Sequence, residues 1–172
     1  MIESARNKQF NTAIVVNGDG VLVKKYRKIH LFPVSQEHKS YTAGRVITTF
    51  NMGGVKCGIT ICYDLRFPEL FRALMKKGVK IVFVPANWPA SRREHWLALL
   101  RARSIENQFF VAGINRVGKD PQLDYSGDSV VFDPWGKQLA CAKTKKEELI
   151  FANLDFKCLE IIRKEYPFLR EI

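Results

Sequence analysis

Apolar runs separated by short turn signals occupy the first third of the chain and predict paired strands. The turn Asn17-Gly18-Asp19-Gly20 is typical of a hairpin, because Asn-Gly and Asp-Gly supply positive φ angles. Gly53-Gly54 indicates a second turn of this kind. The polar stretch 30–45 between the two turns is expected to be a loop. We therefore expect two strand pairs, 10–16 with 21–29 and 46–52 with 55–63.

A helix with a following strand is predicted after the second pair. Pro68 opens the helix 68–77 and Gly78 closes it, and the apolar run 79–85 reads as the next strand. A strand–helix–strand unit implies a parallel pair with a right-handed crossover. Cys62 then lies near the carboxyl end of its strand.

The last part of the chain predicts a longer helix, several short strands and a terminal helix. The long helix runs over 91–107 and begins with a capping box, Ser91 to Glu94. Its apolar residues are expected on one side, namely Trp96, Leu99, Leu100 and Ile105. Further strands are expected at 109–117, 129–132, 138–142 and 149–154, with a turn at Pro134-Trp135-Gly136. Asp155 can cap a last helix that ends before Pro167.

Length and composition indicate one α/β domain covering residues 1–172. The chain has 172 residues, 47% of them hydrophobic, and no repeat or linker divides it. No run of about 18 apolar residues and no signal-peptide pattern occurs, so we expect a soluble cytoplasmic protein without membrane contact.

The formal net charge of +11 raises the possibility of nucleic-acid binding. The densest basic runs, 24–28 and 143–146, lie far apart and carry no nucleic-acid motif. A solvated basic surface is therefore favoured over a nucleic-acid site, although an acidic partner would also balance the charge.

Four cysteines, at 57, 62, 141 and 158, show neither a CxxC pair nor a Cys–His ligand spacing. This argues against a zinc site and against a disulfide scaffold, so we expect reduced thiols. Cys62 follows an apolar strand and precedes a helix start, which would lower the pKa of its thiol. The alternative is an inert buried cysteine, and Cys57 fits that description at least as well.

Lys28 and Glu37 are further candidates that the pattern leaves open. Lys28 lies on a strand face with several polar residues, which usually means solvent. A lysine beside a thiol can, however, stabilise a thiolate and the oxyanion of a tetrahedral intermediate. Glu37 stands in a polar loop, where an acid is ordinarily exposed, and His30, His38 and His95 show no spacing that identifies a base.

Several motifs together resemble those of the carbon–nitrogen hydrolase (nitrilase-like) superfamily. The resemblance begins with Tyr26-Arg27-Lys28-Ile29-His30-Leu31-Phe32 and with the run Gly58 to Phe67, which contains Cys62-Tyr63-Asp64-Leu65-Arg66-Phe67. It continues in family order through Pro85 to Pro89, His95-Trp96, Arg101 to Gln108, Asn115 to Gly118 and Asp133 to Gly136. These stretches look most like the ω-amidase branch, which acts on 2-oxoglutaramate and related amides.

The resemblance implies a four-layer α-β-β-α sandwich of which this chain covers about the C-terminal two-thirds. It implies a Glu–Lys–Cys mechanism with no metal or other cofactor, in which Cys62 is the nucleophile, Lys28 the oxyanion partner and Glu37 the second glutamate. The family's first glutamate belongs to a segment before Phe10, and Glu3 lies too near the following strand to replace it. The sandwich is therefore expected to be N-terminally incomplete.

The resemblance also implies hydrolysis of small carboxylate-bearing amides through a Cys62 thioester. Tyr63, Arg66, Asn87 and Trp88 are the expected substrate-binding residues, with Arg66 gripping the carboxylate. Arg66 could instead form a structural ion pair, with Asp64 or Glu69. The alternative to an active amidase is an impaired fragment or subunit that associates with a complete partner. Expected partners are a small amide, further copies in a homodimer or higher homo-oligomer, and an N-terminal complementing segment.

Overall fold

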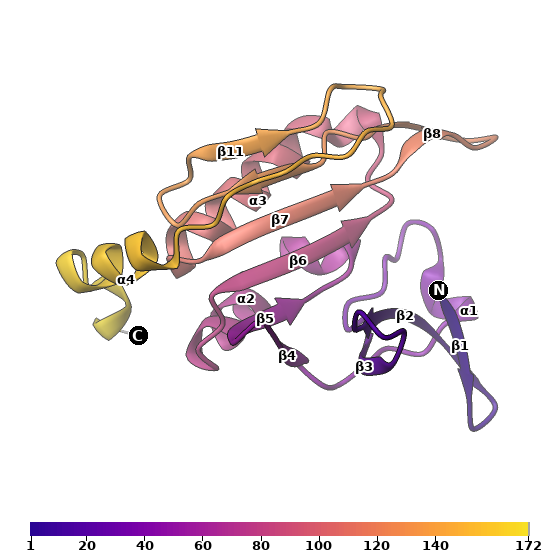
Figure 1. Ribbon diagram of the computed structural model, residues 1–172. Coiled ribbons are helices and arrows are strands. Elements are labelled where there is room, and N and C mark those ends of the chain that lie inside the picture. Colours follow the sequence, from indigo (N-terminus) through magenta and orange to yellow (C-terminus); the bar gives the residue numbers. More distant parts are fainter. Residues whose placement is uncertain (172) are drawn as a thin grey trace.

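A six-stranded mixed sheet forms the centre of the computed structural model, which describes residues 1–171. The strand order is β11-β10-β7-β6-β5-β4, and the three middle strands β5, β6 and β7 are parallel in series (Figure 1). The bounds are β4 (Thr49–Met52), β5 (Val55–Ile59), β6 (Ile81–Ala86), β7 (Phe110–Asn115), β10 (Val130–Phe132) and β11 (Gln138–Cys141). The carboxyl ends of the parallel strands therefore meet at one edge, where ligands bind in open α/β sheets.

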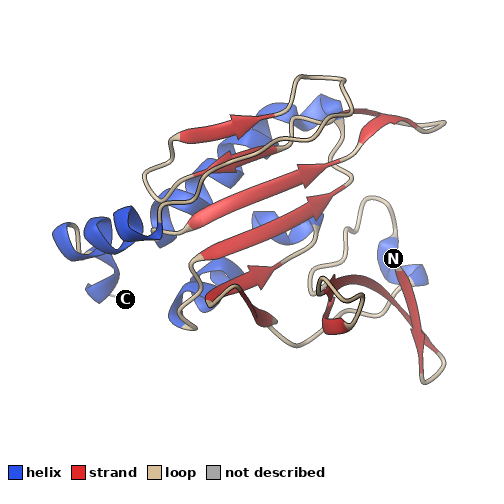
Figure 2. Cartoon of the chain, in the orientation of Figure 1, coloured by secondary structure: helices blue, strands red, loops and turns tan. Residues whose placement is uncertain are grey.

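Two helices cover one face of this sheet, α2 (Pro68–Lys76) and α3 (Arg93–Asn107) (Figure 2). The core beneath them contains the fully buried side chains of Leu74, Trp96 and Leu100. Strand β7 presents Gly113 to this core, so that the helix packs close to the strand backbone.

A three-stranded antiparallel sheet, β1-β2-β3, lies beyond the carboxyl ends of β5 and β6 (Figure 1). Its strands are β1 (Ile2–Ala5), β2 (Lys8–Val16) and β3 (Leu22–Arg27). Tyr26 of β3 is fully buried and belongs to the same apolar cluster as Phe50 and Ile59 of the larger sheet. Burial of this aromatic ring holds the two sheets together.

The C-terminal helix α4 (Phe156–Glu165) begins at Asp155, whose carboxylate accepts hydrogen bonds from the backbone N–H groups of Lys157 and Cys158. The segment before it runs along the face of the sheet opposite α2 and α3 (Figure 1). Phe156 packs there against Phe110, with ring centroids 5.4 Å apart.

The structure confirms the α/β class, both predicted strand pairs, the parallel crossover and the Asp155 cap. The strand expected over 55–63 ends at Ile59, because residues 62–66 turn into a 3₁₀ helix. The strand expected over 149–154 is not formed. Leu149 and Phe151 are strongly exposed, since β11 pairs with β10 alone and offers this segment no ladder.

Two expectations for the long helix were also wrong. Residues Ala90–Arg92 form a 3₁₀ turn, so Ser91 does not cap α3, and the N-cap residue Arg92 makes no side-chain cap hydrogen bond. Ile105 points outward and is 49% exposed. The sequence missed four short elements: β1, α1 (Glu37–Ser40), β8 (Val117–Lys119) and β9 (Asp124–Ser126).

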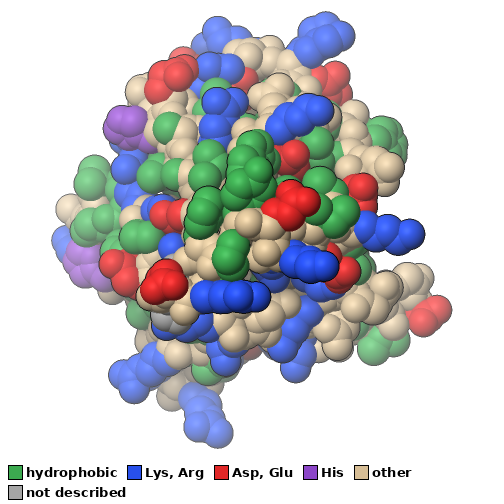
Figure 3. All heavy atoms as spheres, turned by 90° about the vertical axis from the view of Figure 1, so that its left-hand side faces the viewer, with side chains coloured by type: hydrophobic (Ala, Val, Ile, Leu, Met, Phe, Trp, Pro, Cys, Tyr) green, Lys and Arg blue, Asp and Glu red, His purple; other side chains and the backbone are tan. Residues whose placement is uncertain are grey.

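Positive side chains are spread over the face that contains α4 and gather in no single patch there (Figure 3). Hydrophobic side chains lie between them on this face. Near the C-terminal end of the chain, Ile161 of α4 and Phe168 are exposed. None of the helices in residues 1–171 combines the length and hydropathy needed to cross a bilayer.

Gly113→Ala should destabilise the fold by about 1–3 kcal/mol, the usual cost of an overpacked core. The added methyl would lie 2.4 Å from Cδ1 of Leu100 and 2.6 Å from Cζ2 of Trp96, so the helix must shift. Urea denaturation measures the change. Gly18→Ala is the matched control, because its methyl would meet nothing within 4 Å. Equal midpoints for the two variants would contradict this account of α3 packing.

Candidate active site

Cys62 occupies a strained turn at the carboxyl edge of the central sheet. It begins the 3₁₀ helix Cys62–Arg66 with a φ of 48°, a left-handed conformation that non-glycine residues rarely adopt. Such backbone costs about 1–3 kcal/mol and persists where surrounding contacts enforce it. Its sulfur lies 3.9 Å from the carbonyl oxygen of Asn87, at the end of the neighbouring strand β6.

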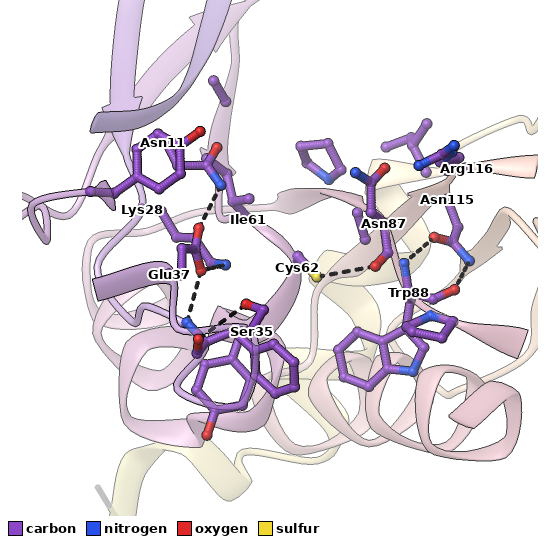
Figure 4. Close-up of a pocket in the computed structure, with 18 of the residues that line it drawn as sticks. Asn11, Lys28, Ser35, Glu37, Ile61, Cys62, Asn87, Trp88, Asn115 and Arg116 are labelled. Atoms are coloured by element: carbon purple, nitrogen blue, oxygen red, sulfur yellow. Dashed lines mark hydrogen bonds and ion pairs between the residues drawn. The ribbon is translucent and has the colours of Figure 1, made fainter. Parts of the chain in front are cut away.

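Lys28 and Glu37 form a buried ion pair in the same pocket as Cys62 (Figure 4). Lys28 is 4% exposed, and its Nζ lies 2.6 Å from Oε2 of Glu37. The carboxylate also accepts hydrogen bonds from the Phe32 N–H at 2.7 Å and from Asn11 Nδ2 at 2.8 Å. Both residues thus belong to the site, although their local pattern was compatible with solvent.

The charges around Cys62 act in opposite directions on its thiol. Burial raises the pKa of Cys62, the Lys28 ammonium lowers it, and the Glu37 carboxylate raises it. The net direction is upward, because burial outweighs the ammonium. A lowering contribution from the helix start stays a prediction. Because burial dominates, the protonated thiol is favoured, and a reaction that uses the thiolate would need a base.

Glu37 is poorly suited to be that base. Burial works against its ionisation, yet hydrogen bonds from Lys28, from the Phe32 backbone and from Asn11 outweigh burial and keep the pKa of Glu37 below its ordinary value. Its two oxygens are already occupied by these three donors. Glu37 is also the only carboxylate that lines the pocket within residues 1–171.

The other expected residues, Tyr63, Arg66, Asn87 and Trp88, all line this pocket, which has a volume of about 980 Å³. Arg66 stacks over the ring of Trp88 at 4.9 Å, and its Nη2 lies 3.3 Å from Nδ1 of His95. Within the described part of the chain, Arg66 forms no ion pair with Asp64 or Glu69. Its guanidinium therefore remains available to an anion.

Among the other polar residues of the pocket, Asn11, Arg92 and Asn115 were not identified from the sequence as site residues. Asn115 bridges both backbone groups of Trp88, accepting from its N–H at 2.8 Å and donating to its carbonyl at 3.1 Å. It is the last residue of β7 (Phe110–Asn115), so the rule that parallel strands end at one edge could have found it. Asn11 and Arg92 carried no comparable signal.

Comparison with known proteins gives a consistent family. The sequence model of the carbon–nitrogen hydrolases matches residues 1–164. The chain is 39% identical over 163 residues to 2-oxoglutaramate amidase of Bacillus subtilis (strain 168), covering 95% of this chain and 62% of that protein. It is 35% identical over 179 residues to human omega-amidase NIT2, covering 98% of this chain and 64% of that protein.

A solved structure shows the same fold. XC1258 from Xanthomonas campestris, a CN-hydrolase superfamily protein with an arsenic adduct in its active site, superposes with a TM-score of 0.90 at 35% identity. The match covers 97% of this chain and 65% of that one. The nitrilase-type α/β fold expected from the sequence is therefore confirmed, and the chain spans about two-thirds of the length of these relatives.

Lys28→Met should move the pH midpoint of Cys62 alkylation upward, because the ammonium that favours the thiolate is lost. Glu37→Gln should move it downward, because a repelling carboxylate is removed. Rates of iodoacetamide labelling, measured against pH and resolved by peptide mapping, give both midpoints. Lys24→Met, at an exposed lysine of β3, the strand that ends just before Lys28, is the control and should leave the midpoint in place. Shifts of the same sign in the first two variants would contradict this electrostatic account.

Proposed function

The chain belongs to the carbon–nitrogen hydrolase family, and on that premise we propose that it hydrolyses the C–N bond of small carboxylate-bearing amides such as 2-oxoglutaramate. The observation that carries the proposal is one pocket holding the Cys62 thiol, the buried Lys28–Glu37 pair and unpaired guanidinium groups. The names of the relatives support the substrate class, because they include 2-oxoglutaramate amidase and omega-amidase.

Cys62 is the proposed nucleophile. Its sulfur attacks the amide carbonyl carbon, and the resulting oxyanion is stabilised by the Lys28 ammonium and by the Tyr63 backbone N–H. Collapse of this intermediate breaks the C–N bond, and the nitrogen takes up a proton and leaves as ammonia. Water then attacks the Cys62 thioester, which releases the carboxylic acid and regenerates the thiol.

The thiol chemistry is supported by the arsenic adduct in the active site of XC1258, because arsenic binds thiolates strongly. In this chain Cys62 lines the pocket, while Cys57 of β5 is fully buried in the apolar cluster that also contains Tyr26. Cys62 is thus the cysteine that a small reagent or substrate can reach from the pocket.

Proton transfer is the step that residues 1–171 serve least well. The thiol must lose a proton, ammonia must gain one, and the attacking water must lose one. Glu37 holds Lys28 in place and is already saturated with donors. The family resemblance asks for a further glutamate, so amide turnover by these residues without it should be slow even where acylation of Cys62 succeeds.

Carboxylate recognition is assigned to Arg66, with Arg92 as a second cation. Both line the pocket, and neither pairs with a carboxylate in the described residues. Arg92 lies 5.6 Å from the Phe32 ring centroid. A planar guanidinium binds a carboxylate through two parallel hydrogen bonds, which a lysine cannot do.

A second candidate is a catalytically impaired subunit that binds a complete partner or another copy of the chain. It is favoured by the single carboxylate of the pocket, which is engaged by Lys28. Such a subunit would keep an acylatable thiol, so acylation alone does not separate the two candidates. Amide turnover separates them.

The chain should be acylated at Cys62 by an activated ester, yet release ammonia from 2-oxoglutaramate about 10²–10⁴-fold more slowly than its relatives, because the one carboxylate that lines the described pocket is engaged by Lys28 and is not free for general acid–base catalysis. A nitrophenyl-ester burst and a coupled ammonia assay measure the two steps. Cys62→Ala should abolish the burst.

Adding the N-terminal third of the Bacillus subtilis relative as a separate chain should raise ammonia release if the chain is an amidase, and should not if it is an impaired subunit. Fast turnover by the chain alone would contradict this prediction.

Arg66→Lys should reduce the preference of Cys62 for a glutarate monoester over a neutral butyrate ester roughly tenfold, the equivalent of about 1.4 kcal/mol. The charge is kept, but the paired hydrogen bonds to the carboxylate are lost. Acylation rates with the two nitrophenyl esters give the ratio. Arg45→Lys, at an exposed arginine outside the pocket, serves as the control. An unchanged ratio in Arg66→Lys would remove Arg66 from carboxylate recognition.

A further inference from the structure

A buried carboxylate two residues after Cys62 joins the two halves of the site. Asp64 is completely buried and is not among the residues that line the pocket. Its Oδ2 accepts from the Tyr26 hydroxyl at 2.7 Å and from the Ile61 N–H at 2.9 Å. Its Oδ1 accepts from the His30 N–H at 2.9 Å and lies 2.8 Å from Nδ1 of the same residue. Four donors around one carboxylate satisfy a buried charge that would otherwise be costly.

Two of these partners flank Lys28. Tyr26 precedes it by two positions and His30 follows it by two. These hydrogen bonds therefore fix the backbone on both sides of Lys28. The ammonium of Lys28 points toward Glu37. The sequence separations are 38 and 34 residues, so the contacts tie the three-stranded sheet to the central one.

The third partner holds the turn of the nucleophile. The N–H of Ile61 donates to the Asp64 carboxylate, and the N–H of Asp64 donates to the carbonyl of Ile61 at 3.0 Å. This reciprocal pair closes the turn around Cys62, whose φ of 48° is unfavourable for a residue with a side chain. One carboxylate thus fixes both the backbone of Cys62 and the strand of Lys28.

The ring of His30 is itself held in place. It stacks on Phe67 with centroids 3.6 Å apart and planes 6° from parallel. This orients Nδ1 toward Asp64, and the side chain cannot rotate away without losing the stack. The His30 ring is therefore held by Asp64 and Phe67 and is not available as a general base.

We propose that Asp64 is a positioning residue that sets the placement of the Lys28 ammonium relative to the Cys62 sulfur through Tyr26, His30 and Ile61. The proposal rests on the proposed function, since both groups must then act on the same substrate carbonyl. Misplacement by about 1 Å can cost a reaction up to about 100-fold in rate. Loss of one of the four hydrogen bonds should therefore impair a step in which Lys28 must meet an oxyanion far more than a step in which Lys28 affects only the ionisation of the thiol.

The test compares two reactions of the same thiol in Tyr26→Phe, which removes one hydrogen bond and leaves the carboxylate and the ring. Acylation by a nitrophenyl ester needs Lys28 at the oxyanion, whereas alkylation by iodoacetamide forms no oxyanion. Acylation should fall about tenfold and alkylation much less. In a Lys28→Met background, Tyr26→Phe should add nothing to the fall in acylation. A merely structural defect would slow or speed both reactions together, in both backgrounds.

Thr144→Val is the matched control, because it removes a hydrogen bond of 2.7 Å to another buried carboxylate, Asp128, and neither residue lines the pocket. Its ratio of acylation to alkylation should equal that of the unmodified chain. A ratio in Tyr26→Phe that also equals it would overturn the positioning role.

A chain that is alkylated but never acylated would contradict the proposed function and still leave positioning testable. The upward shift of the alkylation midpoint caused by Lys28→Met should then be smaller in Tyr26→Phe than in the unmodified chain. An equal shift in the two backgrounds would overturn the proposal by itself. Asp64→Asn, which keeps one acceptor oxygen, gives a second variant for the same comparison and should show the same loss.

Discussion

The ammonium group of Lys28 is almost completely withdrawn from solvent, and a charge in that environment must be neutralised and hydrogen-bonded to be tolerated. Glu37 meets this requirement at 2.6 Å. To reach the ammonium, the chain after β3 must turn back as the short helix α1, and Phe32 and Asn11 then supply the remaining donors to the carboxylate. The conformation of the loop thus follows from one buried charge.

The buried ion pair also gives Glu37 and Cys62 different properties in the pocket. Because Glu37 is kept ionised and fully hydrogen-bonded, it stabilises Lys28 and is not free to accept protons. Because burial raises the pKa of Cys62, the thiol does not ionise by itself despite the nearby ammonium. A fixed positive charge beside a neutral thiol is suited to stabilising an oxyanion that forms only during a reaction. The ammonium is then already in place where the negative charge develops.

Local sequence patterns predicted most strands and helices, because apolar runs, Gly turns and the Asp155 cap are decided by neighbouring residues. The family resemblance selected Cys62 and Lys28. The local pattern could not have identified Glu37. In the sequence Glu37 looks like an exposed acid in a polar loop, because its burial depends on an ion pair with a lysine nine positions away. Asn11 and Arg92 come from elements that meet only in the folded chain, so their place in the pocket required the structure.

Sheet geometry alone places half of the site. Cys62 and Asn87 follow the parallel strands β5 and β6, and Asn115 is the last residue of the adjacent strand β7, so the three share one edge by topology. Lys28 comes from the other sheet, and no ladder of hydrogen bonds sets its distance from that edge. Tyr26 sets this distance instead, because its ring packs against the central sheet and its hydroxyl donates a hydrogen bond to Asp64. The placement of Lys28 relative to Cys62 is therefore more sensitive to the docking of the two sheets than to the stability of either sheet.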